Sequence, residues 1–332
     1  MIKFFRHIRK SLINDNNMSK YFKYAIGEIL LVVIGILIAL QINNWNERKQ
    51  NTLKVDNLLQ KILKDIELDL SDIADLTRFY ATKDSLANLV LNDKLTKEDY
   101  QDPEKMELHF LARNYSEINL RINSYNNLMR YQDIIPKKYD ALLEQLYLQY
   151  SDQFNFVMQV ESRYRDDMDK YKDYLFENYE WNFTQDYLTN TDRINFYLNN
   201  VRYKGMVREY QSSAIHNYLR FNIDYAYAAI DTYKQINEVL NNKSIKPLFN
   251  FEADSSIFGT YRTLFNEDFE LVSVGTRDHV VSETDTVNLF QYASNKFFMQ
   301  NNFVRFDKVN DSLNFYINAY ENGAKPFATK VN

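Results

Sequence analysis

Residues 25–42 read AIGEILLVVIGILIALQI, and every position in 29–40 is apolar apart from the neutral Gly35. About 18 to 20 helical residues suffice to cross a hydrocarbon core of about 30 Å. Residues 24–43 meet that length. A helix in a soluble core normally keeps one polar face, whereas this run is apolar on all faces. The sequence therefore predicts one transmembrane helix over residues 24–43.

Aromatic side chains mark both ends of this predicted span. Tyr21, Phe22 and Tyr24 precede it and Trp45 follows it, as expected for rings that prefer the membrane interface. No small-x-small cleavage site follows the apolar run, which disfavours a cleaved secretory signal. We therefore interpret the segment as an uncleaved anchor with these four residues at the interface.

The net charge of −5 is unevenly distributed along the chain. Residues 1–24 hold six Lys or Arg against one Asp, so they carry +5 and the remainder carries −10. The positive-inside rule then predicts a cytoplasmic basic segment over residues 1–23, against the lipid headgroups. We expect a single-pass protein of the bacterial inner membrane, with the bilayer as a partner and a periplasmic C-terminal body. The acidic body argues against nucleic acid as a partner.

Small residues form a stripe within the span. Gly35 and Ala39 make a small-xxx-small pair, with Gly27 on roughly the same face two turns earlier, which predicts helix packing through this face. Glu28 lies about one turn inside the cytoplasmic edge. We favour an anchoring role, in which Glu28 reaches the lipid headgroups or pairs with a nearby lysine. The alternative is a role in proton or ion binding.

Composition favours long helices after the span. The 332 residues are 45% hydrophobic and 15% aromatic, with only 6 Gly and 4 Pro to form turns and no Cys. Apolar positions at helical spacing predict long helices over about residues 55–80, 139–175 and 206–240, with shorter ones near 106–112, 124–133 and 192–202. No Gly or Pro separates the first from the span, which predicts one continuous rod. One-faced helices must pack together, so we expect an antiparallel periplasmic helical bundle over residues 44–246 with the aromatic stripes as its core.

The pattern changes after Pro247. Short alternating runs such as 269–274 (FELVSV), 286–290 (TVNLF) and 313–317 (LNFYI) are divided by Asn, Asp and Gly turns. Seven or so short strands predict a small antiparallel β-barrel or sandwich over residues 247–332. The predicted fold class is mainly α with a C-terminal β domain.

Two resemblances follow from longer matches. Residues 24–47 (YAIGEILLVVIGILIALQINNWNE) and the MIKFFR opening resemble the hallmark of an uncharacterised family of single-span proteins of Bacteroidota. That resemblance implies topology and a helical extracytoplasmic region, but no activity.

The C-terminal part resembles the small β-domain appended to serine β-lactamase-like hydrolases, through FGTY at 258–261, NKFF at 295–298, VRF at 304–306, NG at 322–323 and ATKV at 328–331. Where that family usually has a turn glycine, this chain has Asn310 and Asp311, which tolerate the left-handed backbone. This resemblance implies a fold and no chemistry, since no hydrolase domain accompanies it.

Catalytic and metal-binding signatures are missing from the sequence. It has no G-x-S-x-G, S-x-x-K, G-x-x-x-x-G-K or Cys, and the four His residues are far apart. The cluster of Asp166, Asp167 and Asp169 is typical of a solvated helix face. We therefore expect no catalytic residues, no cofactor and no metal site.

The first resemblance also implies candidate O-glycosylation. Bacteroidota attach glycans to extracytoplasmic Asp-Ser/Thr-apolar triplets, and three occur here, with acceptors Ser85, Thr286 and Ser312. The leading functional hypothesis is a non-enzymatic membrane-anchored scaffold or accessory subunit that binds another membrane or periplasmic protein, or itself. The alternatives are a periplasmic ligand sensor that relays a signal across the membrane and an enzyme with an unrecognised site.

Overall fold

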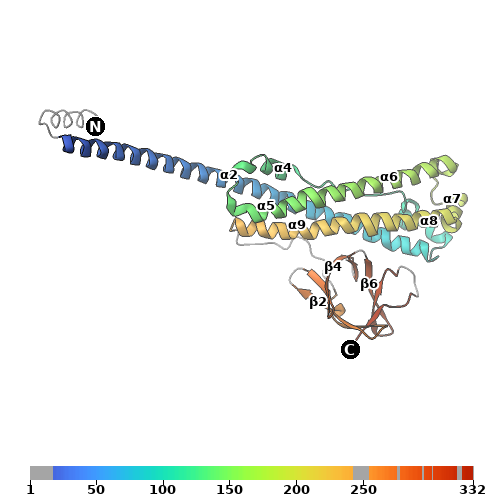
Figure 1. Cartoon of the computed structure of the whole chain (residues 1–332). Helices are drawn as coiled ribbons and strands as arrows, with labels where there is room; N and C mark the ends of the chain where they lie inside the picture. Colours follow the sequence, from blue (N-terminus) through green and yellow to red (C-terminus); the bar gives the residue numbers. More distant parts are fainter. Residues whose placement is uncertain are drawn as a thin grey trace.

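The computed structural model describes residues 18–241, 254–274, 277–293, 295–300, 302–319 and 324–331. It consists of a long N-terminal helix that continues into a helical bundle, and a β-barrel packed on the side of that bundle (Figure 1). The predicted fold class is therefore confirmed. The expected boundary between the two folded parts, at residues 246 and 247, lies outside the described residues.

Helix α2 (Met18–Leu91) has 74 residues without interruption. This confirms the prediction that the apolar span and the first amphipathic stripe form one rod. Every residue from 29 to 50 is exposed, whereas residues from Val55 onward bury one face. The first part is long and apolar enough to cross a membrane, and the second is the central helix of the bundle.

Two further rods pack against α2, each containing a stretch of π-helix. The second rod contains α5 (Asp140–Tyr147), the π-helix η4 (Leu148–Gln153) and α6 (Phe154–Asn178). The third contains α8 (Val201–Tyr210), the π-helix η6 (Gln211–Leu219) and α9 (Arg220–Val239). The predicted helices at 139–175 and 206–240 are thus present, with wider π turns that hydrophobic spacing does not reveal.

Shorter elements connect the rods. They are α3 (Lys97–Gln101), α4 (Asn123–Met129), α7 (Thr191–Asn199) and the 3-10 turns η1 (Pro103–Phe110), η2 (Gln132–Ile134), η3 (Lys137–Tyr139) and η5 (Glu180–Phe183). The expected helix over 192–202 ends early, because Asn200 leaves the helical conformation and caps α8 through Arg202 N–H and Tyr203 N–H.

Hydrogen bonds and ring contacts fix the directions of the rods. Along α2, Asp56 meets Tyr139 and Tyr80 meets Tyr164, so the second rod runs parallel to α2. The third rod is antiparallel, since Glu67 bonds Tyr233 while Asp84, further along α2, bonds Gln211 earlier in the chain. The predicted antiparallel arrangement is therefore correct for the third rod and wrong for the second. A parallel second rod requires a return crossing, which the segment between η1 and α4 provides.

Tyrosines form the centre of the bundle, as predicted for the aromatic stripes. The rings of Tyr164 and Tyr210 lie 6.2 and 6.4 Å from that of Tyr80, and the ring of Tyr218 lies 6.0 Å from Tyr80 and 5.4 Å from Tyr164; all four residues are buried. Their hydroxyls need partners in this dry interior. Tyr218 donates to Glu161 at 2.6 Å, and Tyr80 donates to a backbone carbonyl at 2.8 Å.

The C-terminal part is a closed antiparallel barrel whose eight described strands follow in chain order, with β8 closing onto β1. The strands are β1 (Gly259–Thr263), β2 (Asp268–Val274), β3 (Arg277–Val281), β4 (Thr286–Ala293), β5 (Lys296–Met299), β6 (Asn302–Val309), β7 (Ser312–Ile317) and β8 (Ala328–Lys330). Asn310 and Asp311 have φ of 48° and 63°, the left-handed backbone expected where a turn glycine is missing.

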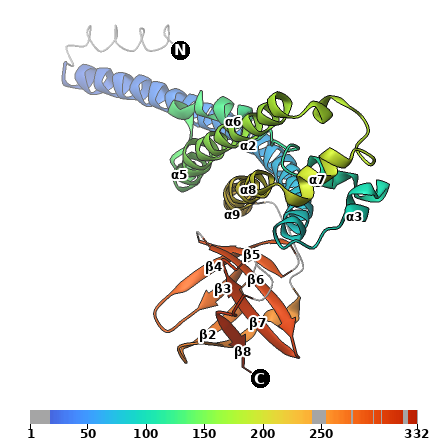
Figure 2. The same cartoon turned by 90° about the vertical axis from the view of Figure 1, so that its right-hand side faces the viewer.

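The barrel packs on the bundle through β4, β5 and β6 (Figure 2). Tyr292, Phe298 and Phe303 from these strands join the hydrophobic core of the bundle. A buried carboxylate anchors the contact, because Asp84 of α2 accepts from Lys296 Nζ at 2.5 Å and Gln211 Nε2 at 2.7 Å. The barrel therefore rests directly on the helix that carries the apolar N-terminal segment.

Candidate functional site: a polar groove at the far end of the bundle

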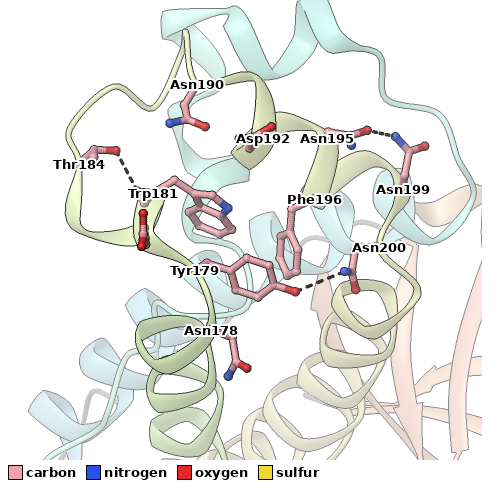
Figure 3. Close-up of a pocket in the computed structure, with 11 residues that line it drawn as sticks. Asn178, Tyr179, Trp181, Thr184, Asn190, Asp192, Asn195, Phe196, Asn199 and Asn200 are labelled. Atoms are coloured by element: carbon pink, nitrogen blue, oxygen red, sulfur yellow. Dashed lines mark hydrogen bonds between the residues drawn. The ribbon is translucent and has the colours of Figure 1, made fainter.

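A hollow among the described residues lies where α6 ends and the chain turns into α7. These elements form the end of the bundle away from the apolar helix (Figure 1). It is an open groove of about 720 Å³. Figure 3 shows aromatic rings at its centre and polar side chains around them. We call it the distal groove; it is lined by Asn178, Tyr179, Glu180, Trp181, Thr184, Asn190, Asp192, Asn195, Phe196, Asn199 and Asn200.

Three aromatic rings form the floor of the distal groove. The centroids of Tyr179, Trp181 and Phe196 lie 4.6 to 5.3 Å apart, so each ring packs against the other two. Trp181 and Phe196 are 8% and 5% exposed, while Tyr179 is only half-buried. Burial and the neighbouring Tyr174 hydroxyl raise the pKa of the Tyr179 phenol. The floor is therefore a neutral, fixed aromatic surface.

Amides and carboxylates form the rim. Asn190 and Asn200 also cap α7 and α8, because their side-chain oxygens accept from backbone N–H groups of the following turn. Asn199 donates to Asn195 at 2.5 Å. Glu180 and Asp192 are exposed acids. The capping positions explain why asparagine recurs here, and the side-chain nitrogens of the two caps donate to Asp186 and to the Tyr179 hydroxyl.

A fully buried arginine supports the groove from behind. The Arg193 guanidinium donates to the backbone carbonyls of Trp181 and Thr184, and lies 4.2 Å from the centroid of the Tyr187 ring. Burial lowers the pKa of Arg193. Both carbonyls belong to the segment between α6 and α7, which forms one wall of the groove. The Arg193 side chain therefore fixes the shape of that wall.

The residues predicted to act in the membrane lie apart from the groove, on the free part of α2. A Cβ added at Gly27 or Gly35 would meet no atom within 4 Å, so this face is open, and Ala39 is exposed too. Phe22 and Trp45 are exposed. The side chains of Tyr21 and Tyr24 lie outside the described residues. Packing and interface roles for these residues stay predictions.

The three predicted glycan acceptors differ in their surroundings. Thr286 begins β4 and Ser312 begins β7, and both are exposed next to exposed aspartates. Ser85 is exposed on α2, but its triplet partner Asp84 is buried beneath the barrel. An enzyme could therefore read the full triplet at Thr286 and Ser312, but not at Ser85 in the folded chain.

Metal-binding side chains do not gather anywhere in the described ranges: no group of three His, Asp or Glu residues could hold an ion. His109 is buried and contacts the Tyr100 carbonyl at 2.8 Å, and burial lowers its pKa. The acidic cluster on α6 is solvated as predicted, with Asp167 and Asp169 paired to Lys170 and Lys172.

Sequence reasoning missed the distal groove. A signal was present, because five asparagines lining it fall within residues 178–200, together with Tyr179, Trp181 and Phe196. Helical spacing assigns such aromatics to a core. Trp181 and Phe196 are indeed buried in the core of the bundle. Only the reversal of the chain between α6 and α7 shows that they pack with the half-buried Tyr179 beneath an open groove.

Fold and groove together define a class: a chain with one N-terminal helix long and apolar enough to span a membrane, a helical bundle continuous with it, and an eight-stranded barrel on its flank. Residues 28–135 match the model of a family of unknown function, DUF6090. The match covers most of α2 and the chain up to the start of the second rod. It agrees with the resemblance of the apolar segment to an uncharacterised family. Searches of curated proteins and of solved structures find no match. The likeness of the barrel to a hydrolase-appended domain stays a prediction.

Proposed function

We propose that this chain is a non-enzymatic scaffold or accessory subunit, anchored in the bacterial inner membrane, whose periplasmic bundle and barrel hold another protein at a fixed distance from the bilayer. The observation that carries the proposal is the unbroken helix α2. A membrane helix that continues into the core of a bundle transmits position rigidly, unlike a flexible linker.

Helix geometry sets the distances. From residue 43 to Val55, where burial begins, the helix rises about 18 Å, and from there to Leu91 about 54 Å more. The far end of the bundle would then stand about 70 Å from the bilayer surface. Such a reach suits a spacer or docking arm. The orientation follows from the basic residues before the span.

Exposed apolar side chains suggest where a partner binds. Phe183 and Val201 are exposed at the far end of the bundle, and Leu264 and Phe265 at the β1–β2 turn of the barrel. Adjacent exposed apolar groups, unlike single ones, are characteristic of interaction surfaces. Leu264 and Phe265 are neighbours in the chain, and the ring of Phe183 lies 5.4 Å from the exposed ring of Phe176. Two such places on two folded parts fit an accessory subunit that contacts a partner at more than one point.

Photo-crosslinking from native membranes tests the proposal. A photo-reactive residue at Phe183 or Phe265 should capture a second protein, and one at the exposed Asp166 on α6 should not. Adducts with the chain itself alone would favour self-association. No adduct at either apolar site would count against the scaffold. A tag after residue 332 should be digested by protease in intact spheroplasts; protection would reverse the orientation.

A second candidate, a ligand sensor, is supported by the contact between the barrel and α2. Lys296 of β5 pairs with Asp84 on α2, the helix that carries the apolar segment. A movement of the barrel would therefore be transmitted to α2 through this ion pair. Transmission requires two arrangements of this contact. Two distances between spin labels on Thr286 and Asp166 in the native membrane would support a sensor over a static scaffold.

A further inference from the structure

We propose that the distal groove binds a neutral saccharide, with the Tyr179 ring as the stacking surface and the amides and carboxylates of the rim as hydroxyl ligands. The structure carries this through one juxtaposition: a fixed aromatic floor surrounded by side chains that both donate and accept hydrogen bonds. The inference stands independently of the scaffold proposal, because it concerns the groove alone.

The rim has unused hydrogen-bonding capacity. An amide side chain offers two donor hydrogens and two acceptor lone pairs. Within the described residues, Asn195 uses only its oxygen, toward Asn199, and Asn178 uses only its nitrogen, toward the Tyr174 carbonyl. The exposed carboxylates of Glu180 and Asp192 make no hydrogen bond with another residue in the described part of the chain. Sugar hydroxyls, which donate and accept at once, match this mixed set.

The floor supplies the apolar half of the contact. A pyranose ring has one face of C–H groups that packs on an aromatic ring as other apolar groups do. Tyr179 is partly exposed and is held between Trp181 at 5.1 Å and Phe196 at 4.6 Å. A surface that is already fixed loses little conformational freedom when a ligand binds.

Charge narrows the ligand class. The lining residues, all in the described part of the chain, include two acids and no Lys or Arg. Arg193 lies buried behind the wall and donates to two backbone carbonyls. Arg202 is outside the lining but near enough to act on the Tyr179 phenol, and its guanidinium packs on the Tyr174 ring. A phosphorylated or acidic ligand would still have to approach the two exposed carboxylates of the rim, which repel it, whereas a neutral polyhydroxylated ligand is not repelled.

A peptide fits the groove less well. Peptides are usually held by a free strand edge, an apolar groove for a helix, or aromatic slots for proline. Helical segments border this groove, its rim is polar, and its rings pack mainly on each other. Neither backbone pairing nor an apolar side-chain pocket is offered, so the saccharide is the ligand that we propose.

The chain carries its own reporter for the test. It has two tryptophans, Trp45 beside the span and Trp181 in the groove floor. In full-length protein with Trp45→Phe, reconstituted in nanodiscs, emission reports on the groove alone. The probes are maltohexaose, cellohexaose and chitohexaose, with a pool of random heptapeptides as the competing class. We expect at least one hexasaccharide to change Trp181 emission saturably, with a Kd of about 1 mM or tighter.

Matched variants locate the binding. Asp192→Ala with Asn195→Ala removes two exposed rim groups and should weaken the responding saccharide at least about tenfold. The control changes Asn155 and Asp173 to Ala, an exposed amide and acid elsewhere on α6, and should leave affinity unchanged. Unaltered thermal melting of both double variants shows that folding is intact.

Three outcomes would overturn the proposal. They are no emission change with any hexasaccharide, equal affinity in the rim and control variants, or saturable binding of the heptapeptides instead. Tyr179→Phe refines the test: it keeps the ring and should keep most of the affinity, whereas Tyr179→Ala should abolish binding. Because the readout is Trp181 emission, failure here leaves the crosslinking test of the scaffold untouched.

Discussion

Two isoleucines on the same helix lie in opposite surroundings. Ile34 is 53% exposed in the free part of α2, and Ile66 is 0% exposed in the bundle. The free part is apolar on every face and carries a single acid, Glu28, between residues 25 and 46. The bundle part is apolar on one face and charged on the other. One continuous helix thus has a first part apolar enough to span a membrane and a second part that packs in a bundle facing water.

The difference shows how each half satisfies its polar groups. In a lipid bilayer no water is present, so the polar groups of the backbone must be satisfied by the hydrogen bonds within the helix itself. Charged side chains would have no partner there and are nearly absent. In the bundle, charges on α2 are buried only with partners: Asp69 with Arg121, Lys83 with Glu107, and Asp84 with Lys296. The comparison can be tested by placing the same charged residue in each half of α2 and by removing the partner of a buried charge.

The largest effect should come from Ile66→Lys. It places an unpaired charge where no water reaches, which should destabilise the bundle by more than about 4 kcal/mol. Urea unfolding followed by tyrosine fluorescence measures the loss. Ile34→Lys is the control and should leave the bundle's unfolding midpoint where it is. An equal loss of unfolding free energy in the two variants would mean that the surroundings of Ile34 and Ile66 do not differ as described.

Ile34→Lys should act instead on membrane insertion. A lysine at the centre of a span costs about 2.5 to 3.5 kcal/mol, so part of the protein should become extractable by alkaline carbonate. Ile34→Leu should remain fully in the membrane pellet. If the lysine variant is retained as completely as the leucine variant, the apolar segment is not held by a bilayer.

The pair of Asp84 and Lys296 should contribute a smaller amount. Among the described residues, Lys296→Met leaves the buried Asp84 carboxylate with Gln211 and Tyr292 as its remaining hydrogen-bond partners, and it should cost about 1 to 3 kcal/mol. With Asp84→Asn added, the combined loss should fall short of the sum of the single losses. Strict additivity in this double-mutant cycle would show that the two side chains do not interact.

A pH effect should follow from Asp69. Burial outweighs its ion pair with Arg121 and raises the pKa of Asp69 to about 6, above the value in an unfolded chain. The folded state then binds more protons than the unfolded one between about pH 4 and 6. Stability should fall as pH rises through this window, by up to about 1.4 kcal/mol per unit, and level off above it.

Asp69→Asn should flatten that slope in urea midpoints measured from pH 4 to 7. Burial raises the pKa of Asp224 to about 6 as well, so part of the slope should remain. The exposed Asp166→Asn serves as the control. An unchanged slope in Asp69→Asn would contradict the assignment.

The smallest effect concerns the boundary between the halves. Trp181→Phe leaves Trp45 as the sole tryptophan, and brominated lipids should quench its emission most when the bromine lies near the headgroups. Quenching strongest at the bilayer centre would move the boundary, and no quenching would place Trp45 in water.

Local patterns made much of the fold predictable. The rod from the span into the bundle followed from apolar residues without Gly or Pro, and the β part from period-two alternation in stretches such as 269–274. The directions of the helical rods were less accessible. The parallel second rod depends on how the chain returns between η1 and α4, and that crossing carries no periodic signal.

The distal groove and the contact of Asp84 with Lys296 were not predicted. Asp84 and Lys296 are 212 positions apart, and nothing near either residue indicates the other. Asn190 and Asn200 could be recognised as helix caps, yet a cap does not reveal that its amide also faces an aromatic floor.

The sequence by itself determined which segments are apolar on all faces and which are apolar on one face only. It could do so because the spacing of hydrophobic residues within a helix or strand is a local property of the chain. Only the tertiary structure decided which polar groups meet, whether Tyr179, Trp181 and Phe196 at an open surface or Lys296 on a buried carboxylate. Those meetings depend on the packing of whole elements, where many side chains far apart in the chain together fix one arrangement.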